Sequence, residues 1–405
     1  MNPSDRLGPG WPVPLLSSKV MTRPLLASRL RGFGTTIFAE MSALAEVTGS
    51  VNLGQGFPDY DGPQEVLDAA VAAIGQGLNQ YPPGPGVAPL REAIAAHQRR
   101  WYGLEVDPAT EVLVTAGATE AITAVLLALC EPGDEVVVFE PTYDSYTAAI
   151  SMAGAVPRFV PLAPDGGWDR ADLARAVSAR TRLILLNTPH NPTGKVFSAE
   201  EMAAVAEVAS AADVLVVTDE VYEHLVFDGS HVPMAALPGM AERTLTVSSA
   251  GKTFSVTGWK IGWCVGPAAL VAAVRTAKQF LTYVNGGPFQ YAVATGLGLP
   301  DEIFLGQRDE LRDRRDQLVS GLEGLGARVF VPAATYFATI DVRSLGADDG
   351  LEFCRRLPEV CGVVAIPSQV FYQNGAAGAP YVRFAFCKRA EVIAEALTRL
   401  QKWGG

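Results

Sequence analysis

The sequence predicts an α/β protein with a mostly parallel sheet between two layers of helices, followed by a smaller α+β domain. Short apolar runs rich in valine and isoleucine alternate with longer segments of helical periodicity, which is typical of strands buried on both faces. Several runs end in polar or charged residues, and the carboxyl edge of an open α/β sheet is where ligands bind. The 405 residues are 49% hydrophobic and 19% charged, which is enough for one large and one smaller domain.

Seven apolar runs are predicted as the strands of the large sheet. They span residues 111–116, 135–140, 156–162, 182–187, 214–219, 244–248 and 261–265. Segments of helical periodicity lie between them, among them residues 119–129, 143–153, 169–177 and 199–211. This alternation predicts parallel strands joined by helices that cover both faces of the sheet.

After about residue 300 the pattern changes to that of a smaller α+β domain. A charged helix is predicted at 309–325, strands at 327–331, 335–341 and 381–387, a helix from residue 349, and a last amphipathic helix. The helical segment 29–51 has no obvious sheet of its own, so we expect it to pack against this domain and to bridge two subunits. The predicted organisation is a disordered extension (1–28), a first segment of the small domain (29–50), a large domain (51–297) and the rest of the small domain (298–405).

The charge and the cysteine content narrow the class of protein. The formal net charge of −11 argues against a nucleic-acid or anionic-membrane surface. The five cysteines are scattered and contain no Cys-x-x-Cys pair, so neither a disulfide framework nor a metal site is expected. No apolar run approaches the ~18 residues of a membrane span, and the N-terminal segment lacks the apolar core of a secretory signal. We therefore expect a cytoplasmic protein.

One lysine has an unusual setting. Residues 248–260 read Ser-Ser-Ala-Gly-Lys-Thr-Phe-Ser-Val-Thr-Gly-Trp-Lys, which places Lys252 among small residues just after a predicted strand. Small neighbours let a planar cofactor lie against the backbone, and a lysine shielded from water has a lowered pKa that favours the nucleophilic free amine. No Gly-x-x-x-x-Gly-Lys spacing makes the segment a P-loop. Taken alone, a Gly-Lys-Thr segment in a loop is more often an ordinary turn.

Three further loops follow predicted strands. Asp219 ends an apolar strand, where its carboxylate would be partly desolvated unless it meets a cation; a helix cap or a core salt bridge is the simpler interpretation of that residue alone. Asn191 lies in a His-Asn-Pro-Thr-Gly turn at 190–194, where its amide is able to reach a phenolic oxygen. Residues 115–120 run from strand into helix, and the free N–H groups of a helix start suit a phosphate.

With these motifs in this order, the chain resembles a pyridoxal-phosphate (PLP) enzyme of fold type I, in the class I and II aminotransferase family. The resemblance extends from about residue 29 to the C-terminal helix. It is carried by the segments 52–58 (Asn-Leu-Gly-Gln-Gly-Phe-Pro), 79–81 (Asn-Gln-Tyr), 117–119, 190–194, 219–222 (Asp-Glu-Val-Tyr), 248–260 and 381–384 (Tyr-Val-Arg-Phe). It implies pyridoxal 5'-phosphate as the cofactor, no metal, and a homodimer with shared active sites.

The resemblance also implies roles for individual residues. Lys252 would bind PLP as a Schiff base and then move a proton between the substrate α-carbon and the cofactor, while Asp219 would pair with the pyridinium nitrogen. Tyr222 and Asn191 would hydrogen-bond the phenolic oxygen, and Tyr143 would stack on the ring.

The phosphate of the cofactor has its own expected set of residues. In this resemblance it is held by Gly117, Ala118, Thr119, Ser249 and Lys260, with Tyr81 reaching it from the partner subunit. Some relatives have arginine where this chain has Lys260, and a lysine serves as a point charge rather than a fork.

Arg383 is the expected substrate anchor. A guanidinium within an apolar strand pattern suits bidentate capture of the substrate α-carboxylate, with Asn191, the Gly56 backbone and Phe38 beside it. A structural salt bridge is the alternative for the arginine alone. Because both half-reactions share one site, the resemblance implies a ping-pong reaction between an amino-acid donor and a 2-oxo acid acceptor, with 2-oxoglutarate expected as the acceptor.

The donor is predicted from finer similarities. The segments 54–59 and 249–254 are most similar to the branch of kynurenine, glutamine and methionine aminotransferases, and within it 79–86 and 219–227 are similar to N-succinyldiaminopimelate aminotransferases of lysine biosynthesis. N-succinyl-LL-2,6-diaminopimelate is therefore the expected donor. Kynurenine, glutamine and methionine are its rivals, because residues 284–288 offer no arginine for a dianionic side chain, whereas Phe38, Tyr81 and Tyr283 predict a pocket that tolerates long or apolar side chains.

Two other functions stay open. One is β-elimination from cysteine conjugates, because the same α-carbanion would be formed and only its later fate differs. The other is a non-catalytic regulator with this fold, against which the acidic charge and the presence of Lys252, Asp219 and Arg383 argue.

Overall fold

A seven-stranded sheet forms the centre of the larger part of the molecule. The structure is a computed structural model that describes residues 25–34 and 36–403. The strands are β2 (Val112–Thr115), β3 (Glu135–Glu140), β4 (Val156–Pro161), β5 (Thr181–Asn187), β6 (Leu215–Asp219), β7 (Thr244–Ser249) and β8 (Gly262–Val265). Their order is β2-β8-β7-β6-β5-β3-β4, and β8 alone runs opposite to the other six strands. The predicted, mostly parallel sheet is confirmed.

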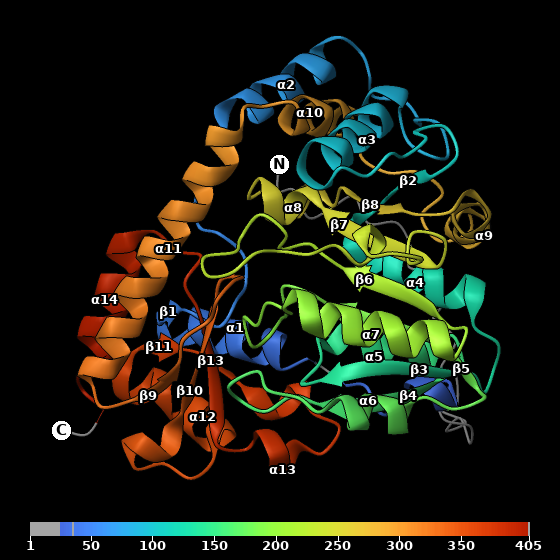
Figure 1. The fold of residues 1–405 in the computed structure, drawn as a ribbon. Helices are drawn as coiled ribbons and strands as arrows, with labels where there is room; N and C mark the ends of the chain where they lie inside the picture. The colour runs from blue at the N-terminus through green and yellow to red at the C-terminus, as the bar shows by residue number, and fades with distance from the viewer. Residues whose placement is uncertain (1–24, 35, 404–405) are drawn as a thin grey trace, which may run out of the picture.

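Helices cover both faces of this sheet because both faces are apolar. Along β3, Val136 and Val138 pack on one side with helices α4 (Gly117–Leu129), α5 (Asp144–Met152) and α9 (Ala268–Lys278). Val137 and Phe139 pack on the other side with α6 (Arg170–Ala176) and α7 (Ala199–Ala211). A third layer, α2 (Gln64–Gly75), α3 (Ala88–Tyr102) and α10 (Gly287–Leu297), covers the β2 and β8 edge (Figure 1).

A second, smaller sheet lies beside the first, among the red and orange elements of Figure 1. It is antiparallel, in the order β12 (Ile366–Pro367), β13 (Tyr381–Ala385), β10 (Phe337–Asp341) and β9 (Arg328–Phe330). Its core includes residues from α11 (Asp301–Gly324), α12 (Gly350–Cys361) and α14 (Ala390–Leu400). The early helix α1 (Ile37–Thr48) packs into the same core, and β1 (Val51–Asn52) pairs with β11 (Val363–Val364). The domain boundaries at 50 and 297 stay predictions.

Two predicted helices begin several residues away from their predicted starts, whereas α4, α5 and α6 differ from the prediction by one or two residues at an end. The segment expected to be helical from residue 29 contains a short 3₁₀ turn (Ser28–Leu30) and becomes α-helical only at Ile37, because two glycines intervene and the Thr36 hydroxyl caps the helix by accepting a hydrogen bond from the Ala39 N–H. Helix α11 begins at Asp301 instead of residue 309, directly after Pro300 and with two acidic residues in its first turn. Most of the predicted disordered extension, residues 1–24, lies outside the described residues.

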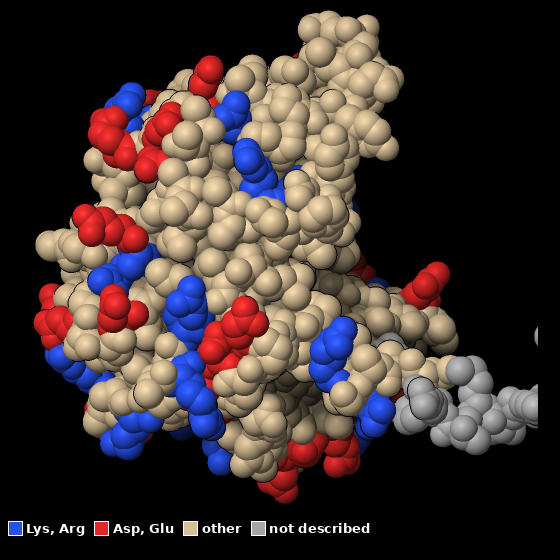
Figure 2. All heavy atoms as spheres, turned by 90° about the vertical axis from the view of Figure 1, so that its right-hand side faces the viewer, with Lys and Arg blue, Asp and Glu red and all other residues tan. Residues whose placement is uncertain are grey.

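The surface carries charges of both signs. On the face shown in Figure 2, lysine and arginine side chains are interspersed with aspartate and glutamate side chains and do not gather into one large basic area. Among the helices of the described part of the chain, none combines the length and the apolar character that crossing a membrane requires.

Candidate active site

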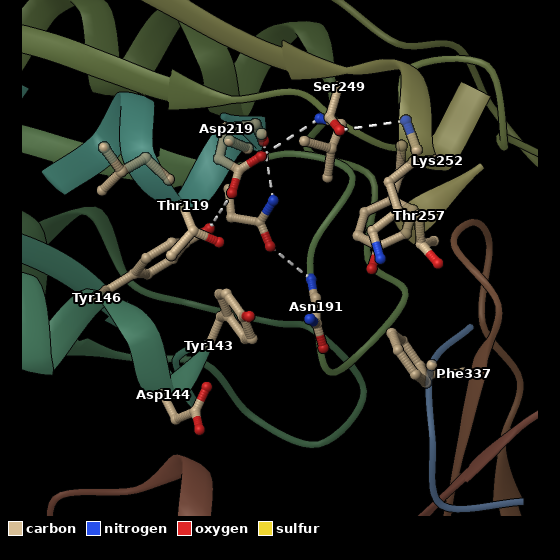
Figure 3. Close-up of a pocket in the computed structure, with 18 of the residues that line it drawn as sticks. Thr119, Tyr143, Asp144, Tyr146, Asn191, Asp219, Ser249, Lys252, Thr257 and Phe337 are labelled. Carbon is tan, nitrogen blue, oxygen red and sulfur yellow. Dashed lines mark hydrogen bonds between the residues drawn. The ribbon is translucent and has the colours of Figure 1, made fainter. Parts of the chain in front are cut away.

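The carboxyl ends of three adjacent strands meet at one cavity. Asn187 ends β5, Asp219 ends β6 and Ser249 ends β7, and the register pairs Asn187 with Asp219 directly. Next to them is a cavity of about 450 Å³. Its wall contains most of the residues proposed from the sequence, namely Phe38, Gly56, Gly117, Ala118, Thr119, Tyr143, Asn191, Asp219, Tyr222, Ser249, Lys252, Lys260 and Arg383. Tyr81 and Tyr283 do not line it. Figure 3 shows that the labelled members of this set come from different elements and surround one space.

Lys252 lies on the short helix α8 (Ala250–Thr253), directly after β7. The Ser249 side chain caps this helix by accepting a hydrogen bond from the Gly251 N–H. The Lys252 ammonium is shielded from water, and this desolvation lowers its pKa to about 8. Its Nζ donates a hydrogen bond of 2.6 Å to the Tyr336 hydroxyl. At pH 7 about a tenth of the amine is therefore unprotonated, far more than in an ordinary lysine, and the neutral amine is the form that a nucleophile or a base requires.

Asp219 is a buried carboxylate at the end of β6. Only 4% of the residue is exposed, and burial raises its pKa to about 6. The Tyr146 hydroxyl donates to its Oδ2 at 2.6 Å and the Val221 N–H donates to its Oδ1 at 3.3 Å, which partly offsets the cost of burial. Within the described part of the chain Asp219 forms no salt bridge. Its carboxylate lines the cavity and is suited to a cationic group of a ligand.

The start of helix α4 forms a second subsite with a positive character. Gly117 has φ of +74°, a conformation that favours glycine, and the N–H groups of the first helical turn have no partner within the helix. A Cβ added to Gly262 would lie 2.8 Å from the Ala118 N, so a larger residue there would push into this turn. The Lys260 Nζ lies 3.2 Å from the position of a Cβ on Gly117. Free N–H groups, a helix start and an ammonium together fit a phosphate group.

Arg383 is a buried cation on β13, at the small-domain side of the cavity. Its residue is 2% exposed, and burial lowers the pKa of the guanidinium to about 10. Nη1 donates to the Asn191 Oδ1 at 2.9 Å, and the guanidinium lies 3.8 Å from the centre of the Phe337 ring. No carboxylate in residues 25–34 or 36–403 forms a salt bridge with it, and its Nε has no hydrogen-bond partner. Such a guanidinium is suited to an anionic ligand.

The structure does not bring Tyr81 into the cavity. This residue is 82% exposed and its ring packs edge-on against Tyr283, which is 53% exposed. Tyr222 does reach the cavity, where its ring packs edge-on against Tyr336 at 5.2 Å between centres. The Asn191 Oδ1 accepts a hydrogen bond from Arg383. The contact of Asn191 with a phenolic oxygen stays a prediction.

Sequence reasoning missed several residues of the site. Tyr146 and Tyr336 contact Asp219 and Lys252, and the cavity wall also contains Asp144 and Phe337. One signal was available for Tyr146, because it follows Tyr143 by one helical turn in a predicted helix and so lies on the same face. Tyr336 is brought to Lys252 from the small domain, and no local pattern marks it.

Comparisons with known proteins agree with this geometry. The family model described as aminotransferase class I and II matches residues 48–400. A probable N-succinyldiaminopimelate aminotransferase of Mycobacterium tuberculosis is 56% identical over 388 residues, which cover 93% of this chain and 98% of the relative. The methionine aminotransferase of Escherichia coli is 41% identical over 381 residues, covering 93% and 97%. The solved structure of the N-succinyldiaminopimelate aminotransferase from Mycobacterium tuberculosis has a TM-score of 0.91 at 57% identity, covering 93% of this chain and 99% of that one.

Proposed function

Because the chain belongs to the class I and II aminotransferase family, whose members use PLP, we propose that it transfers the amino group of N-succinyldiaminopimelate to 2-oxoglutarate. The observation that carries the reaction type is the meeting of Lys252, Asp219 and Arg383 around one cavity. The donor is inferred from the relative of that specificity at 56% identity.

The residues around the cavity fit PLP. We assign the phosphate to Gly117, Ala118, Thr119, Ser249 and Lys260, where free N–H groups and an ammonium converge. The turn at Gly117 leaves no space for a side chain at position 262, because a Cβ on Gly262 would lie 2.6 Å from the Gly117 carbonyl carbon.

The ring has its own set of side chains. Asp219 is assigned to the pyridine nitrogen, since its buried carboxylate forms no salt bridge among the described residues. Tyr143 is assigned to the ring face, and Tyr222 and Asn191 to the phenolic oxygen. When bound, PLP supplies an electron-withdrawing ring that stabilises negative charge on the substrate α-carbon.

The protein's own groups perform the remaining tasks. Arg383 binds the substrate α-carboxylate with two parallel hydrogen bonds, and Asn191 holds the guanidinium in place through its Oδ1. The Gly56 backbone and Phe38 line the same end of the cavity. The Lys252 Nζ takes the proton from the substrate α-carbon, because its lowered pKa makes the neutral amine far more accessible near neutral pH than that of an ordinary lysine. The same residues serve both half-reactions, so the reaction is ping-pong.

We also propose a homodimer in the cytoplasm. Tyr81, Phe280 and Tyr283 are exposed aromatic residues, at 82%, 83% and 53%, and a second copy of the chain would cover them. The partner subunit's Tyr81 would then reach the phosphate of the cofactor. The five cysteines are unpaired and buried, which agrees with a reducing compartment.

A second candidate donor is methionine. The Escherichia coli methionine aminotransferase is 41% identical to this chain, and Phe38 and Phe337 give the cavity apolar surface. The cations in the described cavity wall are Lys252, Lys260 and Arg383, all of which already have assigned roles. A dianionic donor therefore needs a cation from outside this wall, whereas methionine does not.

A panel of donors tests the proposal. The purified PLP-loaded protein is assayed with 2-oxoglutarate and N-succinyldiaminopimelate, methionine, glutamine or kynurenine, and the donors are ranked by kcat/KM. We expect N-succinyldiaminopimelate to rank first. A higher kcat/KM for another donor would refute the assigned substrate, and no glutamate formation from any donor would refute aminotransfer. Release of pyruvate and ammonia from a cysteine conjugate without a 2-oxo acid would identify a β-lyase instead.

A further inference from the structure

The hydroxyl of Tyr336 connects two parts of the active site. It accepts a hydrogen bond from the Lys252 Nζ at 2.6 Å and donates one to the Gly56 carbonyl oxygen at 2.7 Å. Tyr336 immediately precedes β10 of the small sheet, whereas Lys252 follows β7 of the large sheet. The Tyr336 hydroxyl therefore connects Lys252, at the end of the large sheet, with the small sheet and with the loop that contains Gly56.

The position of the Tyr336 ring is strongly constrained. The residue is 2% exposed, and its ring contacts those of Tyr222 and Phe337 at centre distances of 5.2 and 4.7 Å. On the Gly56 side, an added Cβ would lie 3.2 Å from the Tyr336 Cε2. A ring enclosed in this way presents its hydroxyl in one direction, so the hydrogen bond to Lys252 does not require ordering of a mobile side chain.

A phenol at this position suits both protonation states of the lysine. When Lys252 is an ammonium, it donates to the phenolic oxygen and the phenolic proton goes to the Gly56 carbonyl, as the two distances show. When Lys252 is a neutral amine, the phenolic proton is able to turn to the lone pair of the nitrogen. Burial keeps the pKa of Tyr336 well above its usual value, so the phenol remains neutral and acts as a hydrogen-bond partner, not as the base.

We propose that Tyr336 is a positioning residue that holds the free ε-amine of Lys252 beside the Gly56 loop in both of its protonation states. This inference rests on the proposed function, because it gives a partner to the lysine that the proposal makes the base. A base must be held within hydrogen-bond reach of the proton it takes, and a free lysine side chain would otherwise sample several rotamers.

Chemical labelling of Lys252 tests this role without turnover. The protein carrying the amine form of the cofactor, pyridoxamine phosphate, leaves Lys252 free, and trace acetic anhydride then acetylates its neutral amine. Mass spectrometry of the Lys252 peptide, with the exposed Lys402 as internal reference, gives the labelling rate as a function of pH. We compare the wild type with Tyr336→Phe, which removes only the hydroxyl, and with Tyr381→Phe, whose ring packs on Phe330 in the small sheet away from the cavity.

The expected result separates positioning from a merely structural role. Hydrogen bonds to charged groups are the stronger ones, so Tyr336→Phe should lower the pKa of Lys252 by about one unit, while Tyr381→Phe leaves it unchanged. Tyr336→Phe should also lower kcat about tenfold with little change in the KM of the donor. A wild-type labelling profile in Tyr336→Phe, or a change in KM alone, would overturn the inference. Failure of the proposed function would appear instead as absent aminotransfer in the wild type, with the labelling result still readable.

Discussion

The Tyr146 hydroxyl donates a hydrogen bond of 2.6 Å to the Oδ2 of Asp219. Both residues are buried, and the bond connects helix α5 to the end of strand β6. Burial raises the pKa of Asp219 to about 6, and the hydrogen bond from Tyr146 opposes that rise because it stabilises the charged carboxylate. Tyr146 therefore helps to keep Asp219 ionised, which the proposed pairing with a cationic ring nitrogen requires.

Replacing this hydroxyl should shift the pH dependence of cofactor binding. In Tyr146→Phe the carboxylate loses a donor, its pKa rises, and Asp219 becomes protonated at a higher pH. As the pH is lowered, we expect the PLP affinity of the variant to fall at a pH about one unit higher than in the wild type. Titration of the PLP-free protein with PLP at a series of pH values, followed by absorbance, measures this shift. Superimposable curves for Tyr146→Phe and the wild type would contradict the role, and Tyr381→Phe is the matched control.

Arg383→Ala should weaken every amino-acid donor to a similar extent. Charge-assisted, bidentate hydrogen bonds to a carboxylate are strong, so we expect the KM of each donor to rise about 100-fold. Steady-state kinetics with several donors measure the effect, and Arg343→Ala is a suitable control because that arginine pairs with Asp341 and is largely exposed. A loss confined to one donor would show that Arg383 binds a side chain and not the shared α-carboxylate.

Lys252→Ala should abolish turnover and the covalent attachment of the cofactor. In the wild type, borohydride reduction of the PLP-loaded protein should leave the cofactor mass on the Lys252 peptide. The variant should bind PLP only reversibly, because the Lys260 ammonium and the start of α4 that hold the phosphate remain. Peptide mass spectrometry and a single half-reaction with the donor check both statements. An unchanged half-reaction rate would show that another group acts as the base.

The sequence predicted the parts of the site that follow from local pattern. Apolar runs predicted the strands, β3 has the predicted bounds, and the ends of neighbouring parallel strands necessarily bring Asn187, Asp219 and Ser249 to one edge. The contacts of Tyr146 with Asp219 and of Tyr336 with Lys252 depend on how α5 and the small sheet dock. Such docking is determined by packing between elements far apart in the chain, which no local periodicity encodes.

His190 should make the folded protein less stable in acid. It is 1% exposed in the turn before Asn191, and burial together with Lys195 lowers its pKa to about 3. The unfolded chain binds a proton at this histidine below its ordinary pKa of 6.5, whereas the folded chain binds it only near pH 3. The free energy of unfolding therefore decreases as the pH falls from 6.5 towards 3. The slope is about 1.4 kcal/mol per pH unit for one proton. Urea unfolding between pH 6.5 and 4.5 measures the free energy of unfolding of the wild type and of His190→Asn. In the variant this free energy should change less steeply with pH, by roughly this amount. Parallel curves for the two proteins would contradict the prediction.

Gly262→Ala should displace the start of α4, which forms the phosphate subsite. Gly262 begins β8 and faces Thr115 of β2, and a Cβ at this position would lie 2.6 and 2.7 Å from the carbonyl carbon and Cα of Gly117 and 2.8 Å from the Ala118 N. These are backbone atoms of the first turn of α4, so they have to move away from the strand. Overpacking of this kind costs about 1–3 kcal/mol and displaces the N–H groups that the proposal assigns to the phosphate.

The neighbouring Gly258 provides the matched control for this variant. A Cβ on Gly258 meets no atom within 4 Å, so Gly258→Ala makes the same chemical change four residues earlier, in the 3₁₀ helix Thr257–Trp259, without a clash. We expect Gly262→Ala to lower the Tm by several degrees and to raise the Kd of PLP at least tenfold, and Gly258→Ala to change neither appreciably. Thermal melting and PLP titration measure the two quantities. A lowered Tm with an unchanged Kd in Gly262→Ala would show that the displaced N–H groups do not hold the phosphate, which would contradict the assigned subsite.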